Sequence, residues 1–145
     1  MQKTIRDLPA LQEEASSFVG TLVARADSAT LITLSGELGA GKTAFTKMIA
    51  NALGIEDTVT SPTFVLEKIY ALPGHSAFER LIHIDAYRLE EGDDLGPLGF
   101  DTLMQDPTNL IMLEWPERVR DALPVATVAI SLAANADGSR TMIYG

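Results

Sequence analysis

The sequence contains no cysteine, which excludes disulfide bonds, thiolate metal sites and a cysteine nucleophile. Its N-terminal residues lack the apolar run of a signal peptide. No apolar stretch approaches the roughly 20 residues that a helix needs to span a bilayer. Together these absences predict a protein that works in the cytoplasm and has no membrane segment.

Basic residues are also scarce. The chain has 11 lysines and arginines against 20 aspartates and glutamates, which gives a formal net charge of −9. Proteins that grip nucleic acid through its phosphates usually present a basic surface. The composition therefore predicts that any role near RNA is indirect and runs through a protein partner.

The rest of the composition is that of an ordinary globular protein, with 46% hydrophobic and 21% charged residues. No repeat or linker divides the chain, so residues 1–145 are predicted to form a single domain. Hydrophobic periodicity predicts helices over 9–26, 42–53 and parts of 93–104, and strands over 31–34, 81–85, 110–114, 125–133 and 141–144, with 59–70 extended. This order favours a three-layer α/β fold with a largely parallel central sheet and antiparallel C-terminal strands.

A glycine-rich segment follows the first of these strands and leads into a predicted helix. Its sequence, Gly36-Glu37-Leu38-Gly39-Ala40-Gly41-Lys42-Thr43, matches the P-loop pattern G-x-x-x-x-G-K-[ST] at every fixed position. Glycines let backbone amides approach phosphate oxygens, and a helix N-terminus favours an anion. Lys42 can reach the β and γ phosphates, and the Thr43 hydroxyl can bind Mg²⁺. This segment, with Ala44 after it, is predicted to hold ATP and Mg²⁺ in a P-loop NTPase fold.

Two acidic residues end apolar strands, as the metal-binding acid of a P-loop enzyme does. Asp85 follows Leu-Ile-His-Ile, and Glu114 follows Leu-Ile-Met-Leu. In a parallel sheet both acids emerge at the carboxyl edge, where ligands bind. The pattern alone leaves open which acid binds the metal and which orients the attacking water.

Other candidate positions flank these acids. Thr63, in the Ser61-Pro62-Thr63 turn, is a candidate sensor of the γ-phosphate and joins Lys42 and Asp85 as a predicted catalytic residue. His83 lies in an apolar strand and is expected to be a core residue. Trp115 is expected to cover the edge of the sheet.

Four segments together resemble the TsaE family, formerly called YjeE. In chain order they are the P-loop GELGAGKT, SPTF at 61–64, HIDAYRL at 83–89 and LEWPER at 113–118. The resemblance covers residues 8–133. It implies a cytoplasmic P-loop ATPase that supports the machinery which installs threonylcarbamoyl on the adenosine next to the tRNA anticodon. The implied partners are TsaD and TsaB, and ATP hydrolysis would let their complex turn over repeatedly.

The resemblance also implies roles for particular residues. Thr43 and Glu114 would be Mg²⁺ ligands, and Asp85 would be the essential active-site acid. Residues 61–64 would be a switch segment, and the N-terminal helix region would help to hold the adenine.

Two other functions share the P-loop. A small-molecule kinase usually carries a lid with several arginines, whereas the long loop at 71–80 has a single arginine. A nucleotide-dependent binding switch that uses GTP needs an Asn/Thr-Lys-x-Asp segment to read guanine, and the sequence has none. We therefore predict a Mg²⁺-dependent ATPase.

The isolated protein is expected to be a weak ATPase. The sequence places no arginine beside the P-loop or the turn at 61–63 to neutralise charge on the γ-phosphate. Activation by partners is therefore predicted, and the resemblance names TsaD and TsaB as those partners, with tRNA contacted only indirectly.

Overall fold

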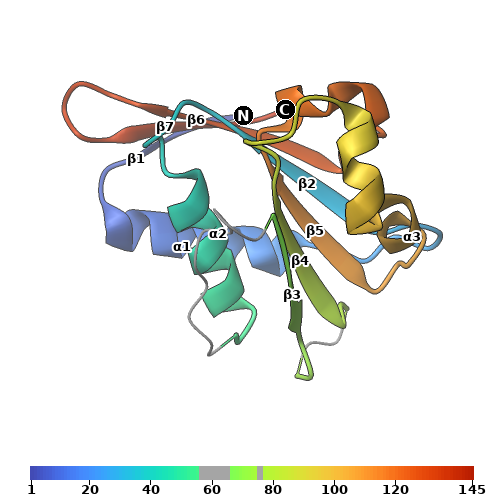
Figure 1. The fold of residues 1–145 in the computed structure, drawn as a ribbon. Coiled ribbons are helices and arrows are strands. Elements are labelled where there is room, and N and C mark those ends of the chain that lie inside the picture. Colours follow the sequence, from blue (N-terminus) through green and yellow to red (C-terminus); the bar gives the residue numbers. More distant parts are fainter. Residues whose placement is uncertain (56–65, 75–76) are drawn as a thin grey trace.

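The computed structural model of the chain describes residues 1–55, 66–74 and 77–145. These residues form a seven-stranded sheet with helices on both faces (Figure 1). The order of strands across the sheet is β1-β7-β6-β2-β5-β4-β3. Their bounds are β1 (Gln2–Ile5), β2 (Thr30–Ser35), β3 (Glu67–Ala71), β4 (Arg80–Asp85), β5 (Asn109–Glu114), β6 (Val128–Ala134) and β7 (Arg140–Tyr144). The predicted three-layer α/β fold is confirmed.

The centre of the sheet is parallel. Strand β5 pairs in parallel with β2 and β4, and β6 pairs in parallel with β2. The edges are antiparallel, because β3 pairs with β4, β7 with β6 and β1 with β7. The predicted antiparallel pairing of the C-terminal strands is therefore confirmed by β6 and β7. Strand β1 was not predicted, since Gln2–Ile5 carries only one buried apolar side chain.

Two helices cover one face of the sheet. Helix α1 (Leu8–Thr21) begins after Asp7, whose carboxylate accepts a hydrogen bond of 2.9 Å from the Ala10 amide. It ends five residues before the predicted Ala26, because Thr21 donates its hydroxyl to the Phe18 carbonyl and Leu22 is extended. Helix α2 (Lys42–Ala52) has the predicted start and ends one residue early.

The core on this face joins both helices to the sheet. Its buried members on the helices are Leu11, Ala15, Phe18, Phe45, Ile49 and Ala50. They pack against Ile32, Leu34, Leu110, Met112, Ile130 and Leu132 on the central strands. Because side chains alternate along a strand, Leu81, His83 and Asp85 of β4 share this helix-covered face. The acids at the strand ends are thereby brought to the same side of the sheet as α2.

Shorter helical segments cover the other face. They are η1 (Gly92–Leu98), α3 (Phe100–Met104), η2 (Pro116–Arg118) and η3 (Arg120–Ala122). The predicted helical region at 93–104 is interrupted at Gly99, which has a φ of 72° and separates η1 from α3. Leu95, Phe100 and Val119 are buried on this face. Within the described ranges, no helix is both long and apolar enough to cross a membrane.

Candidate functional site

A glycine-rich loop connects β2 to α2 at the carboxyl edge of the sheet, as the sequence predicted. Gly41 immediately precedes α2 and has a φ of 107°, a conformation that other residues rarely adopt. Gly36 has a φ of 144°, and a Cβ at this position would collide with the Leu132 carbonyl oxygen of β6. These two glycines therefore let the loop pass close to β6 and enter the helix, whose N-terminal amides favour an anion.

Lys42 is held inside this loop. Its ammonium donates hydrogen bonds to the carbonyls of Gly36 and Glu37, the latter at 3.0 Å. It also lies 4.1 Å from the centre of the Trp115 ring. Burial lowers the pKa of Lys42, and the carboxylates of Glu114, Glu117 and Asp85 oppose that shift. Neutral carbonyls are weaker acceptors than phosphate oxygens, so an anion bound at the loop would compete well for this ammonium.

Thr43 and Glu114, the predicted metal ligands, meet beside the loop. Thr43 lies in the first turn of α2, and its hydroxyl donates to Glu114 Oε1 at 3.2 Å. Glu114 ends β5 and is only 1% exposed. A hydroxyl and a carboxylate oxygen at this separation are ligand types that Mg²⁺ prefers.

Asp85 lies next to Glu114, because β4 and β5 pair these two residues in register. It is partly buried, and its Oδ1 accepts a hydrogen bond of 3.0 Å from the Tyr87 amide. Burial raises the pKa of Asp85, and the Glu114 carboxylate adds to the rise, while the Tyr87 amide, His83 and Lys42 oppose it. Both predicted acids are thus at one edge of the sheet, and Glu114 accepts the hydrogen bond from Thr43.

His83 is fully buried, as expected, and it has a partner that the sequence did not predict. Its Nε2 lies 2.5 Å from Glu114 Oε2. The sequence shows a polar residue in an apolar strand, but the contact with Glu114 depends on the pairing of β4 with β5, which no local pattern records.

Trp115 adopts a left-handed backbone conformation, with a φ of 63°. Such a conformation costs energy in a residue other than glycine and is common at functional sites. Its ring packs against that of Tyr87 in a tilted arrangement, with 4.9 Å between the ring centres and 51° between their planes. The Trp115 ring therefore contacts both the Tyr87 ring and the ammonium of Lys42.

Arg118 lines an open concavity of about 490 Å³ beside the loop. Residues 36–38 form the loop side of this concavity, and Tyr87, Trp115 and Glu117 also contribute. The Arg118 guanidinium lies 5.3 Å from the centre of the Tyr87 ring and 6.0 Å from that of Trp115. It is therefore engaged with aromatic faces in this structure.

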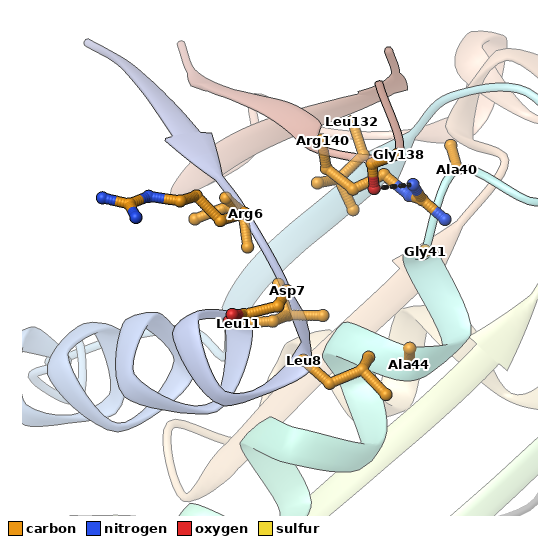
Figure 2. A pocket seen from close by; sticks show the side chains of 11 residues that line it. Arg6, Asp7, Leu8, Leu11, Ala40, Gly41, Ala44, Leu132, Gly138 and Arg140 are labelled. Atoms are coloured by element: carbon orange, nitrogen blue, oxygen red, sulfur yellow. Dashed lines mark hydrogen bonds between the residues drawn. The ribbon is translucent and has the colours of Figure 1, made fainter. Parts of the chain in front are cut away.

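A second cavity, of about 150 Å³, lies between the start of α1, the glycine-rich loop and the hairpin of β6 and β7 (Figure 2). Its lining includes Leu8 and Leu11, then Ala40, Gly41 and Ala44, and finally Leu132 and Arg140. The Arg140 guanidinium donates to the Gly138 carbonyl at 3.0 Å. This volume is below the roughly 300 to 1,000 Å³ of pockets that enclose a drug-sized ligand, so the cavity has room for only part of such a molecule.

The expectation that no arginine lies beside the loop is wrong. Arg118 and Arg140 both line cavities that include loop residues. Arg118 follows β5, and Arg140 is the first residue of β7. The strand order brings both segments to the loop from distant parts of the sequence. Ala40, Gly41 and Ala44 in the smaller cavity were predicted from the P-loop pattern, whereas Leu132 and Arg140 were missed because no local pattern marks them. Thr63, with residues 61–64, lies outside the described residues, so its predicted role stays a prediction.

The similarity to known proteins covers most of the helices and strands described above. The family model described as "Threonylcarbamoyl adenosine biosynthesis protein TsaE" matches residues 10–142. The chain belongs to the TsaE family. The family takes part in threonylcarbamoyladenosine biosynthesis. The matched range contains the glycine-rich loop, both acids and β6, and it ends within β7.

Two similar proteins are named tRNA threonylcarbamoyladenosine biosynthesis protein TsaE. The one from Treponema pallidum is 41% identical over 122 residues, which are 83% of this chain and 86% of that protein. The one from Bacillus subtilis is 33% identical over 132 residues, or 91% of this chain and 79% of that protein. A crystal structure of Bacillus subtilis YdiB superposes with a TM-score of 0.76 at 25% identity, and covers 99% of this chain and 83% of that one. The TsaE fold is therefore shared across nearly the whole chain.

Proposed function

We propose that this TsaE-family chain binds ATP with Mg²⁺ at the Gly36–Thr43 loop and hydrolyses it to support tRNA threonylcarbamoyladenosine modification by TsaD and TsaB. The observation that carries the proposal is the convergence of Lys42, Thr43 and Glu114 where β2 passes into α2. This arrangement provides a cation for phosphate, oxygen ligands for a metal and a helix N-terminus in one place.

The residues beside the loop fit a magnesium ion that phosphate and water also coordinate. Thr43 Oγ1 and Glu114 Oε1 would supply protein oxygens. The described part of the chain has no cluster of three or more His, Cys, Asp or Glu side chains that would form an all-protein metal site. Mg²⁺ usually keeps several waters and binds one or two carboxylates together with substrate phosphates. When bound, the ion would offset negative charge on the phosphates.

The smaller cavity is the proposed binding site for the adenine. Apolar side chains of Leu8, Leu11 and Leu132 line it, and Gly41 and Ala44 connect it to the phosphate end of the site. An aromatic base needs such apolar walls, and a few polar groups then set its orientation. Figure 2 shows Leu8 of α1 and Ala44 of α2 among the side chains that line this cavity.

Lys42 would change partners when a nucleotide binds. Its ammonium would leave the carbonyls of Gly36 and Glu37 for phosphate oxygens, which are charged and stronger acceptors. Trp115, the only tryptophan in the sequence, would lose or alter its contact with this ammonium. Its fluorescence is therefore a direct reporter of nucleotide binding.

Titration with ATP in the presence of Mg²⁺ is expected to change the Trp115 fluorescence at lower nucleotide concentration than titration with GTP. A labelled ATP analogue should likewise be displaced more readily by ATP than by GTP. Equal displacement by the two nucleotides would contradict the base preference. Transfer of phosphate to a small acceptor, with none released as inorganic phosphate, would favour a kinase instead.

Thr43→Ala and Glu114→Gln are each expected to raise the Mg²⁺ concentration needed for half-maximal hydrolysis by about tenfold, because the first removes a proposed ligand and the second removes the negative charge of another. Glutamine keeps a side chain of similar size beside buried His83, which alanine would leave without a partner. Thr43→Ser is the matched control, since it retains the hydroxyl. An unchanged Mg²⁺ requirement in both variants would exclude these residues as the metal site.

Addition of purified TsaD and TsaB is expected to raise the rate of ATP hydrolysis at least about tenfold. Arg118 is stacked on aromatic rings, and Arg140 is bound to hairpin carbonyls, so neither is free to neutralise the γ-phosphate without leaving its partners. A partner that supplies or releases a cation would remove this restriction. The control is the same mixture with Lys42→Ala, which measures hydrolysis by the partners themselves. A rate that the pair leaves unchanged would contradict partner activation.

A further inference from the structure

His83 is a buried residue for which core packing alone gives an incomplete explanation. Its side chain is fully buried, and its Nε2 lies 2.5 Å from Glu114 Oε2. The other ring nitrogen, Nδ1, is also buried and meets no hydrogen-bond partner among the residues that the structure describes. A histidine that only filled space in the core would not need a hydrogen bond with a carboxylate beside the loop.

The two ring nitrogens together indicate which one carries the hydrogen. If Nδ1 carried it, a buried N–H donor would be left unpaired, which costs about 1 to 3 kcal/mol. If Nε2 carries it, this N–H donates to the Glu114 carboxylate, and Nδ1 remains a bare acceptor. The geometry therefore favours the tautomer with hydrogen on Nε2.

Because of this hydrogen bond, the two Glu114 oxygens have different nearest partners. Oε2 is held by His83, while Oε1 is the oxygen nearer to the Thr43 hydroxyl, at 3.2 Å against 3.5 Å for Oε2. In the parallel register of β4 and β5, Asp85 lies opposite Glu114. His83 lies two residues before Asp85, so it is on the same face of the sheet and further from the carboxyl edge. His83 thus approaches the carboxylate from inside the protein, and Oε1 is left toward the loop.

We infer that His83 is a positioning residue, which fixes the Glu114 carboxylate so that Oε1 faces Thr43 and the Mg²⁺ that accompanies the nucleotide. The inference rests on the proposed function. Groups that hydrogen-bond to metal-binding side chains fix their orientation, and loss of such a group typically weakens metal binding about 10- to 100-fold. His83 itself would contact neither the metal nor the nucleotide.

The test compares His83→Leu, which removes the N–H donor, with His83→Gln, whose amide can still donate to Glu114. Mn²⁺ binding is measured by electron paramagnetic resonance with a non-hydrolysable ATP analogue bound. Binding of the same analogue in EDTA is measured through Trp115 fluorescence. We expect His83→Leu to raise the Mn²⁺ concentration for half-saturation at least about tenfold, with analogue binding in EDTA unchanged. His83→Gln is expected to recover most of that loss.

Three outcomes of this comparison would overturn the inference. They are wild-type Mn²⁺ binding by His83→Leu, an equal loss of Mn²⁺ and analogue binding, and a His83→Gln variant as weak as His83→Leu. The last two would mean that the histidine supports packing only. Failure of the wild-type protein to bind Mn²⁺ with the analogue would instead contradict the proposed function, and this inference with it.

A measurement on the unaltered protein keeps the inference testable if His83→Leu does not fold. The sequence has only two histidines, so ¹⁵N labelling of their rings gives a simple spectrum. We expect the His83 ring to carry hydrogen on Nε2 in the complex with Mg²⁺ and the analogue. A ring that carries hydrogen on Nδ1 alone would overturn the inference, because it could not donate to Glu114.

Discussion

Lys42→Ala is expected to lower the rate of ATP hydrolysis by at least about a hundredfold, and nearer a thousandfold if the lysine acts mainly on the transition state. The ammonium lies within the loop, hydrogen-bonded to Gly36 and Glu37, where the phosphates are proposed to bind. Burial and the face of Trp115 limit its contact with water, which strengthens its interaction with a phosphate. The measurement is the rate of phosphate release at saturating ATP and Mg²⁺.

The fold should survive this change, since Lys42 forms the first turn of α2 and alanine is a good helix former. Thermal unfolding of the variant checks this point. Lys47→Ala is the matched control, because Lys47 lies exposed on the same helix and is expected to keep the wild-type rate. Wild-type hydrolysis by folded Lys42→Ala would show that the loop lysine has no catalytic role.

Asp85→Asn is expected to lower the rate of hydrolysis about a hundredfold even at saturating Mg²⁺. Asp85 lies opposite Glu114 at the sheet edge, and burial together with the neighbouring carboxylate raises its pKa. A carboxylate with a raised pKa is a stronger base, so it is suited to accept a hydrogen bond from the attacking water. Asparagine keeps the size and the acceptor for the Tyr87 amide but removes the charge.

The dependence on Mg²⁺ separates Asp85 from Glu114. Glu114→Gln should recover activity as Mg²⁺ is increased, whereas Asp85→Asn should not. Asp101→Asn serves as the control, because Asp101 is exposed in α3 on the other face of the sheet. Full recovery of Asp85→Asn in excess Mg²⁺ would mean that the roles assigned to the two acids are reversed.

The glycine-rich loop and its flanking elements were predictable because their signals are local. The residues at 36–43 specify the turn, the apolar run before them specifies β2, and Gly54 follows the end of α2 with a φ of 89°. The two acids were equally predictable from the sequence, since each directly follows an apolar run in a strand. Parallel strands then bring their carboxyl ends to one edge, so the proximity of Asp85 and Glu114 follows from the fold class.

Features that depend on pairing between distant segments were not predictable. Strand β1 has a mostly polar sequence, and it is held in the sheet by antiparallel pairing with β7. Arg140 reaches the loop because β6 pairs with β2 and β7 pairs with β6, and no local pattern records that order. The contact between His83 and Glu114 likewise requires the register between β4 and β5, although the polar residue in an apolar strand was visible.

The most direct test of this account is the release of inorganic phosphate from ATP by the purified chain. It is measured with Mg²⁺, with EDTA, and with Lys42→Ala in place of the wild-type protein. We expect slow release that requires Mg²⁺ and is lost in Lys42→Ala. Release that persists in EDTA or in folded Lys42→Ala, or no release by the wild-type chain under any condition including added TsaD and TsaB, would contradict hydrolysis of Mg²⁺-bound ATP at this loop.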